Sequence, residues 1–233
     1  MGGAAQWDGE RRVWAGERDV LAVDLPGFGA AADRPVCTDI GAFARHVLAE
    51  ADRAGHERFH LLGHSMGGMV VQEMAALAPH RIDRLVLYGT AASGDLPDRF
   101  EPFEVSKRRA AQDGVAASAD RIAANWFARG AHAPAYRATA ALARRAHPDA
   151  VQAGFDAMRG WSRRDDAARI ASPTLIVWGE RDRTYGWTQT EYLWRAVPRA
   201  SLCVLPDCGH AAHCDAPDLF RTAVGRFLRD APH

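Results

Sequence analysis

The chain has 233 residues, of which 48% are hydrophobic and 25% charged, so we expect one domain with a sizeable core. Its 29 basic and 29 acidic side chains balance, which argues against partners held by charge, such as nucleic acid or an acidic membrane surface. The sequence shows neither a basic segment followed by an apolar run at its start nor an apolar stretch near the ~20 residues of a membrane helix. We therefore expect a cytoplasmic protein.

The cysteine pattern matches no paired C-x-x-C arrangement. Three of the cysteines lie near two histidines along the chain, which raises the question of a metal site, but the close ligand pairs typical of structural zinc are absent. We interpret the cysteines as reduced thiols and expect no metal. The residues concerned are Cys37, Cys203, Cys208 and Cys214, with His210 and His213.

The first third of the chain predicts a strand and a helix. Arg18–Asp24 (RDVLAVD) is typical of a short buried strand, and the turn residues of LPGFG follow it. A helix is predicted to begin at Asp39, which is a good N-cap, and to end at Gly55.

Two further strands and a helix follow directly. FHLL is predicted to be the second strand, GHSMGG comes immediately after it, and the next helix, MVVQEMAALA, ends at Pro79. Leu85–Tyr88 is predicted to be the third strand.

Residues 94–168 interrupt this alternation and predict several short helices. Ser118 is expected to cap one of them and Pro148 to begin another. Afterwards TLIVWG and SLCVL are predicted strands on either side of a helix over Thr188–Val197, and a last amphipathic helix begins near Pro217.

Strands that alternate with helices imply an α/β fold, in which a mostly parallel sheet carries helices on both faces. Right-handed crossovers place the carboxyl ends of the strands at one edge, where such folds bind their ligands. Catalytic residues are therefore expected in the loops that follow the strands.

The segment Gly63-His64-Ser65-Met66-Gly67 has the pattern G-x-S-x-G between an apolar strand and an apolar helix. This is the setting of a nucleophile elbow, a strained turn that lifts the serine oxygen above the sheet. Side chains in place of the flanking glycines are expected to clash with neighbouring strands. The alternative interpretation is a glycine-rich turn with an incidental serine.

A nucleophilic serine needs a base, and the base needs a carboxylate to hold its tautomer. His210 follows the last strand and is the favoured base, with His213 as its nearest rival. For the acid, Asp182 follows the fourth strand, Glu180 lies two residues earlier, and Asp95 follows the third strand.

The segments DLPGFG, GHSMGG, PTLIVWGERD and PDCGHAAHCDAPDLF resemble, in order, segments of the α/β-hydrolase superfamily, and most closely its small-molecule branch of lactonases, esterases and C–C bond hydrolases. The resemblance implies that Ser65 is the nucleophile, Asp182 the acid and His210 the base. It also implies a hydrolase core over residues 1–93 and 169–233, with an inserted helical cap over 94–168.

The chain departs from this family at its start. By the resemblance, MGGAAQWDG corresponds to a loop after an apolar strand, so the first three strands of the usual sheet have no counterpart. One of them normally lies between those that correspond to Arg18–Asp24 and FHLL. We expect the sequence to continue upstream, and the alternative is that another element fills the gap. We also expect the chain as given to be poorly soluble, partly unfolded or dependent on association, for example as a homo-oligomer.

The same departure affects the oxyanion hole. One donor is expected to be the backbone N–H of Met66, and alignment places the second at Met1. Loss of such a donor costs about 10²–10³ in rate.

The cap is expected to line an apolar pocket for a small-molecule substrate. Trp126, Met158 and Trp161 are the chosen wall residues, with Phe127 and Phe155 as further candidates. Packing of the cap on the body is the competing interpretation for each. The run Lys107-Arg108-Arg109 is interpreted as a solvated helix face rather than an anion-steering patch.

The predicted function is hydrolysis of a small ester or lactone by a serine hydrolase that needs no metal or organic cofactor. The alternatives are cleavage of a carbon–carbon bond in a vinylogous diketone and thioester hydrolysis. A different class of alternative is a catalytically impaired hydrolase fold that binds a ligand or partner.

Overall fold

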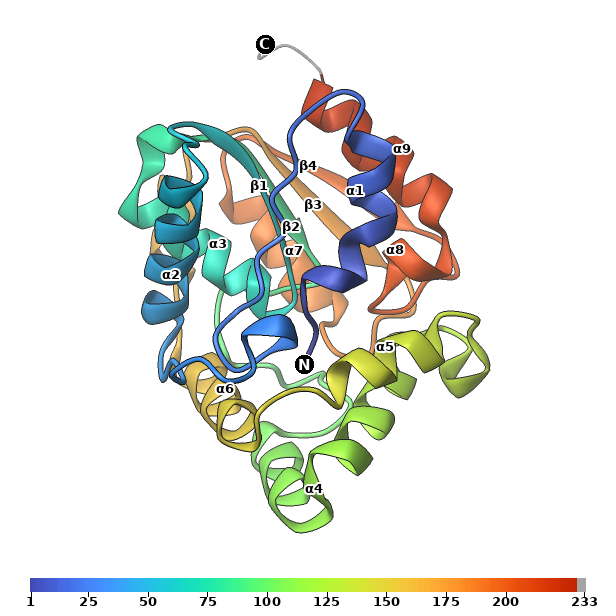
Figure 1. The fold of residues 1–233 in the computed structure, drawn as a ribbon. Helices are drawn as coiled ribbons and strands as arrows, with labels where there is room; N and C mark the ends of the chain where they lie inside the picture. Colours follow the sequence, from blue (N-terminus) through green and yellow to red (C-terminus); the bar gives the residue numbers. More distant parts are fainter. Residues whose placement is uncertain (230–233) are drawn as a thin grey trace.

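The computed structural model describes residues 1–229 of the chain. Its sheet has four parallel strands in the order β1-β2-β3-β4, which are β1 (Phe59–His64), β2 (Ile82–Tyr88), β3 (Thr174–Gly179) and β4 (Ala200–Leu205). Each strand matches a predicted apolar run. The α/β class expected from the alternation of strands and helices is confirmed (Figure 1).

Helices cover both faces of the sheet because side chains alternate along each strand. On one face, Leu85, Leu87 and Ile176 pack with α2 (Ile40–Arg53), α3 (Met66–Leu77) and α7 (Trp187–Ala196). On the other, Val86, Tyr88 and Val177 pack with α1 (Asp8–Trp14) and α9 (Pro217–Arg229). The short helix α8 (Ala212–Asp215) leads into α9.

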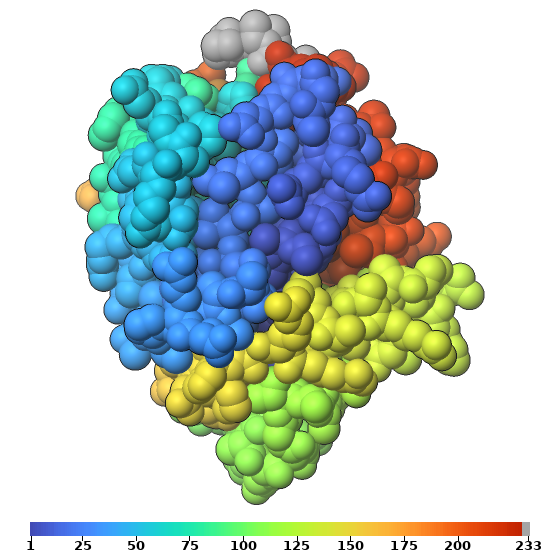
Figure 2. Space-filling view, viewed as in Figure 1, coloured from blue at the N-terminus to red at the C-terminus, as the bar shows by residue number. Residues whose placement is uncertain are grey.

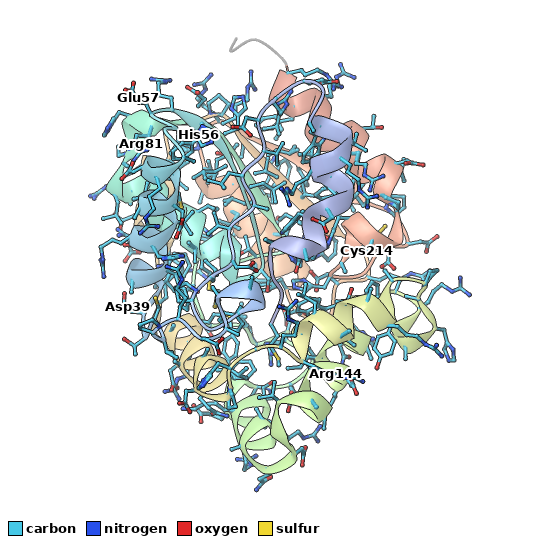
Figure 3. The ribbon with its side chains drawn as sticks, in the orientation of Figure 1. Asp39, His56, Glu57, Arg81, Arg144 and Cys214 are labelled. Carbon is cyan, nitrogen blue, oxygen red and sulfur yellow. The ribbon has the colours of Figure 1, made fainter. Side chains whose placement is uncertain are left out.

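Predicted helix boundaries hold where a local signal sets them. Asp39 caps the N-terminus of α2 by accepting a hydrogen bond from the backbone N–H of Ala42 at 2.7 Å. Asp39 is labelled in Figure 3. Gly55, beyond the end of α2, has a φ of 76° that favours glycine. The guanidinium of Arg81 then fixes the entry to β1 by donating to the carbonyls of His56 and Glu57 (Figure 3).

The residues between β2 and β3 gather at the carboxyl end of the strands (Figures 1 and 2). They form α4 (Phe103–Trp126), α5 (Tyr136–Ala143) and α6 (Pro148–Gly160), with short 3₁₀ turns at Gly130–His132 and Arg164–Arg169. Pro148 begins α6, as predicted. Further 3₁₀ turns lie at Ala4–Trp7, Gly29–Ala31 and Pro79–Arg81.

The prediction that Ser118 caps a short helix is wrong. Ser118 lies inside α4, a 24-residue helix that bends at Gly114, where φ is 78° and ψ is 171°. The Ser118 hydroxyl is buried without a hydrogen-bond partner among the described residues. The break therefore comes from the glycine, and the serine does not cap the helix.

The prediction of a strand over Arg18–Asp24 is also wrong. Residues 19–25 have no regular secondary structure, and β1 has β2 as its one partner within residues 1–229. A cavity of about 510 Å³ separates the two segments and is lined by Val20, Ala22, Leu61 and Leu62 among others. An apolar run becomes a strand only when another strand takes its backbone hydrogen bonds, and here the cavity lies where that partner is needed. The expectation of an upstream segment stays a prediction.

Within residues 1–229, no helix is both long and apolar enough to cross a membrane.

Candidate active site

Ser65 occupies a strained turn between β1 and α3. Its φ of 58° and ψ of −124° are rare for a residue with a side chain, and such strain concentrates at functional sites. The turn is fixed from both sides, because the Ser65 N–H donates to the carbonyl of Tyr88 at 3.0 Å. The Ser65 carbonyl accepts from the Gly68 N–H at 2.9 Å and from the Thr90 hydroxyl at 2.7 Å.

The glycines of the turn differ in what they must avoid. A Cβ on Gly63 would lie 2.3 Å from the carbonyl oxygen of Gly67, and one on Gly68 would lie 2.4 Å from the side chain of Thr90. A Cβ on Gly67 would meet nothing within 4 Å. The expectation that side chains at both flanking glycines would clash with neighbouring strands is therefore wrong. A side chain at Gly63 would clash with the backbone of the same turn, and one at Gly67 would enter open space.

His210 and Asp182 form a buried pair. The Nδ1 of His210 lies 2.7 Å from Oδ2 of Asp182, and neither side chain is exposed to solvent. The other carboxylate oxygen accepts from the backbone N–H groups of Thr184 at 2.7 Å and Tyr185 at 3.1 Å, which fixes the acid. Because a carboxylate accepts, Nδ1 of a neutral His210 carries the proton and Nε2 is left as a base. Nε2 is buried and has no hydrogen-bond partner within residues 1–229.

The competing acids and the competing histidine lie elsewhere. Glu180 accepts from the backbone N–H of Asp207 at 3.1 Å, in an exposed position. Asp95 is exposed. The Nδ1 of His213 faces the Tyr88 hydroxyl at 3.1 Å. Among these candidates, the structure brings only Asp182 and His210 together.

Tyr185 is a site residue that the sequence analysis missed. Its hydroxyl lies near enough to the Ser65 side chain for the serine to affect its pKa, and its ring stacks on that of His210 with 5.5 Å between centroids. Burial raises the pKa of Tyr185 to about 12, so the phenol stays neutral at ordinary pH. The only signal in the sequence was its place in the loop that follows β3.

Ser65 and three other predicted site residues line the 510 Å³ cavity: Met1, Met66 and Trp126. The ring centroids of Trp126 and His210 lie 5.5 Å apart, and the Trp126 backbone carbonyl accepts a hydrogen bond from the Ala211 N–H at 2.7 Å. Helix α4 therefore contacts the loop that carries the candidate base. Since α3 begins at Met66, its N–H belongs to the first helical turn, where amides lack helical acceptors.

Met158 and Trp161 lie at the end of α6, and neither is among the described residues that line this cavity. The indole N–H of Trp161 donates to Glu73 on α3 at 3.0 Å, and Arg163 pairs with the same carboxylate at 2.7 Å. The hydrogen bond from Arg163 lowers the pKa of Glu73. Substrate binding by Met158 and Trp161 stays a prediction.

The basic run and the cysteines lie apart from these residues in the argument for the site. Lys107 of the basic run pairs with Asp156 at 2.7 Å, which ties α4 to α6. The four cysteines are free thiols, and no group of three or more His, Cys, Asp or Glu side chains within residues 1–229 is placed to hold a metal ion.

Comparison with known proteins identifies the family. A family model described as the alpha/beta hydrolase fold matches residues 10–217. The chain belongs to this family. The chain is 29% identical over 235 residues to a Pseudomonas savastanoi protein named as carbamate hydrolase RutD, and the match covers 98% of this chain and 90% of that protein.

Other members of the α/β-hydrolase family differ in the bond they act on. A Pseudomonas putida 2-hydroxy-6-oxononadienedioate/2-hydroxy-6-oxononatrienedioate hydrolase is 31% identical over 229 residues, covering 92% of this chain and 78% of that protein. A hydrolase from Pseudomonas aeruginosa superposes with a TM-score of 0.87 at 28% identity, covering 98% and 86% of the two chains. An enol-lactonase from Burkholderia xenovorans superposes with a TM-score of 0.88 at 24% identity, covering 98% and 88%. The fold is shared with the two solved structures, whereas the names of these proteins point to different substrates.

Proposed function

We propose that the protein is a serine hydrolase that cleaves a small ester or lactone through an acyl-enzyme, with Ser65, His210 and Asp182 as its triad. The observation that supports this most is the buried His210–Asp182 pair, whose 2.7 Å contact leaves Nε2 of His210 as a base beside the strained turn of Ser65.

The chemistry follows from the protonation states. Nε2 of His210 takes the proton of Ser65 as its oxygen attacks the substrate carbonyl, and the carboxylate of Asp182 stabilises the resulting imidazolium. The imidazolium then protonates the leaving alcohol. Water, deprotonated by the same nitrogen, releases the acyl group and regenerates Ser65.

The oxyanion of each tetrahedral intermediate needs fixed donors. The N–H of Met66 is the first, since it lies at the N-terminus of α3, where the helix dipole favours negative charge. We assign the second to the nitrogen of Met1, which lines the same cavity as Ser65 and is an amino group rather than a peptide N–H in this chain. The substrate would enter through this cavity and lie against Trp126.

Cleavage of a carbon–carbon bond is the second candidate. The support for it is the 31% identity to a hydrolase of 2-hydroxy-6-oxo dienedioates. Such a substrate carries carboxylates, whereas a neutral ester or lactone does not. Parallel turnover assays with a vinylogous diketone acid and with neutral esters and lactones distinguish the two.

The test of the triad is Ser65→Ala. We expect this variant to lose esterase activity to near background and to lose labelling by a fluorophosphonate probe, because the attacking oxygen is gone. The exposed Ser201→Ala in β4 is the matched control and should keep both. Equal melting temperatures of the three proteins would exclude unfolding as the cause. Labelling that persists in Ser65→Ala would show that another residue is the nucleophile.

A further inference from the structure

A cluster of buried rings lies behind the candidate base. Tyr88 and His210 are fully buried, and His213 is 4% exposed. The ring centroid of His64 lies 4.3 Å from the ring centroid of Tyr88 and 4.3 Å from that of His210. The ring of His213 stacks on that of Trp7, with 4.7 Å between centroids. Apart from His210, none of these groups has a role in the proposed mechanism.

The backbone carbonyl of His210 is the centre of this cluster. It accepts one hydrogen bond from Nε2 of His64 at 2.9 Å and a second from the hydroxyl of Tyr88 at 2.9 Å. His64 immediately precedes Ser65 in the chain, and the Tyr88 carbonyl accepts the Ser65 N–H at 3.0 Å. Of the two donors, His64 is therefore bonded to the nucleophile along the chain, and Tyr88 is joined to the backbone of the nucleophile by a hydrogen bond.

The hydrogen bonds determine where the protons lie. A carbonyl only accepts, so His64 must carry its proton on Nε2. Tyr88 has one proton and directs it to His210, so its oxygen accepts from the backbone N–H of His213 at 3.1 Å and from Nδ1 of the same residue at 3.1 Å. His213 must then be the Nδ1-protonated tautomer.

The cluster stays uncharged at neutral pH. Burial lowers the pKa of His64 well below its usual value and that of His213 to about 3, and neighbouring His210 adds to both shifts. Burial raises the pKa of Tyr88. Neutral neighbours add no positive charge beside His210 when it becomes an imidazolium, so the cluster holds the base without opposing its protonation.

We propose that His64 and Tyr88 are positioning residues that clamp the carbonyl of His210 and so set the distance from its imidazole to Ser65. The proposal rests on the function proposed above. Neither residue exchanges a proton with the substrate. Loss of the clamp lets the loop of His210 shift, and a displacement near 1 Å at a reacting group costs about 10²-fold in rate.

Two substitutions at His64 separate the hydrogen bond from the packing. His64→Gln places an amide N–H close to the position of Nε2, whereas His64→Leu fills the space without a donor. We expect His64→Leu to lower kcat on para-nitrophenyl acetate by about 10- to 100-fold with KM within about threefold, because the hydrogen bond acts on the base and not on substrate binding. We expect His64→Gln to recover most of this loss. Tyr88→Phe should resemble His64→Leu, and the exposed His80→Leu is the control.

Two further measurements exclude a purely structural effect. Each variant should still reach full labelling by a fluorophosphonate, only more slowly. The low-field proton resonance of His210 Nδ1, expected from its 2.7 Å contact with Asp182, should broaden in His64→Leu and return in His64→Gln.

The outcomes are distinct. If the parent protein neither hydrolyses esters nor reacts with the probe, the proposed function fails. If the parent is active and His64→Leu keeps kcat within about twofold, the clamp is wrong and the proposed function stands. A loss that is equal in His64→Leu and His64→Gln would also overturn the clamp, because the donor would then be irrelevant.

Discussion

The two halves of the sheet, called its two sides below, differ in how completely their strands pair with neighbouring strands. On one side β3 pairs with both β2 and β4, and the acid and the base follow β3 and β4. On the other side β1 faces a cavity of about 510 Å³, and residues 19–25 lie beyond it without regular secondary structure. Ser65 lies at the boundary, since it follows β1 but is held by the end of β2.

This difference shows what an apolar run needs in order to become a strand. TLIVWG and RDVLAVD are similar in length and both rich in aliphatic residues, yet only the first has a neighbour on each side to take its backbone hydrogen bonds. The supported side can hold its loops rigidly, which a triad requires. The side of the cavity leaves space next to the nucleophile, where a substrate would bind.

The largest effect should come from the supported side. Asp182→Asn should lower the acylation rate by about 10⁴-fold, because an amide in place of Oδ2 favours the wrong tautomer of His210. Glu180→Gln is the matched control two residues away, and we expect it to change the rate little, since the exposed Glu180 carboxylate accepts from the backbone N–H of Asp207. Burst kinetics with para-nitrophenyl acetate measure both. If the control lost more activity than Asp182→Asn, the acid would have to be Glu180.

The triad candidates were predictable from sequence because each follows an apolar run and their order matches that of the family. Tyr185, Tyr88 and the position of His64 were not. Tyr185 meets Ser65 only because the loops after β1 and β3 end at the same edge of the sheet. The hydrogen bond from His64 to His210 joins residues 146 positions apart, and no local pattern encodes it.

A smaller effect should separate the two tryptophans that end α4 and α6. Trp126 lines the cavity beside His210, whereas Trp161 donates to Glu73 at the junction with α3. We expect Trp126→Ala to raise KM for long-chain esters by about tenfold while small-probe labelling changes less, because an apolar wall is lost. Trp161→Ala should shift the substrate ranking in the same direction but more weakly.

The control for Trp161 is Glu73→Gln, which keeps an acceptor for the indole while removing the charge that pairs with Arg163. A loss in Trp161→Ala that is equal for every substrate and probe would assign this tryptophan a structural role. The same pattern in Trp126→Ala would remove it from the substrate pocket.

Most of the fold was predictable because local signals mark its elements. These signals are the helix N-cap Asp39, the glycine after α2, and the prolines that begin α6 and α9. The strand predicted over Arg18–Asp24 failed because whether a segment pairs depends on a strand elsewhere in the chain. A pattern along the chain carries no information about whether such a partner is present.

The smallest effect tests the comparison most directly, through one substitution made on each side. Val177 lies in β3 and is 1% exposed, whereas Val20 is half-buried beside the cavity. Val177→Ala should cost about 1.5–3 kcal/mol of unfolding free energy, because two fully buried methyl groups are lost and the packed strands cannot close the space. Val20→Ala should cost less than about 1 kcal/mol, because its side chain already borders a cavity and solvent. Urea unfolding followed by circular dichroism measures both. Equal costs would mean that residues 19–25 are packed as tightly as β3, and the contrast between the two sides of the sheet would then be wrong.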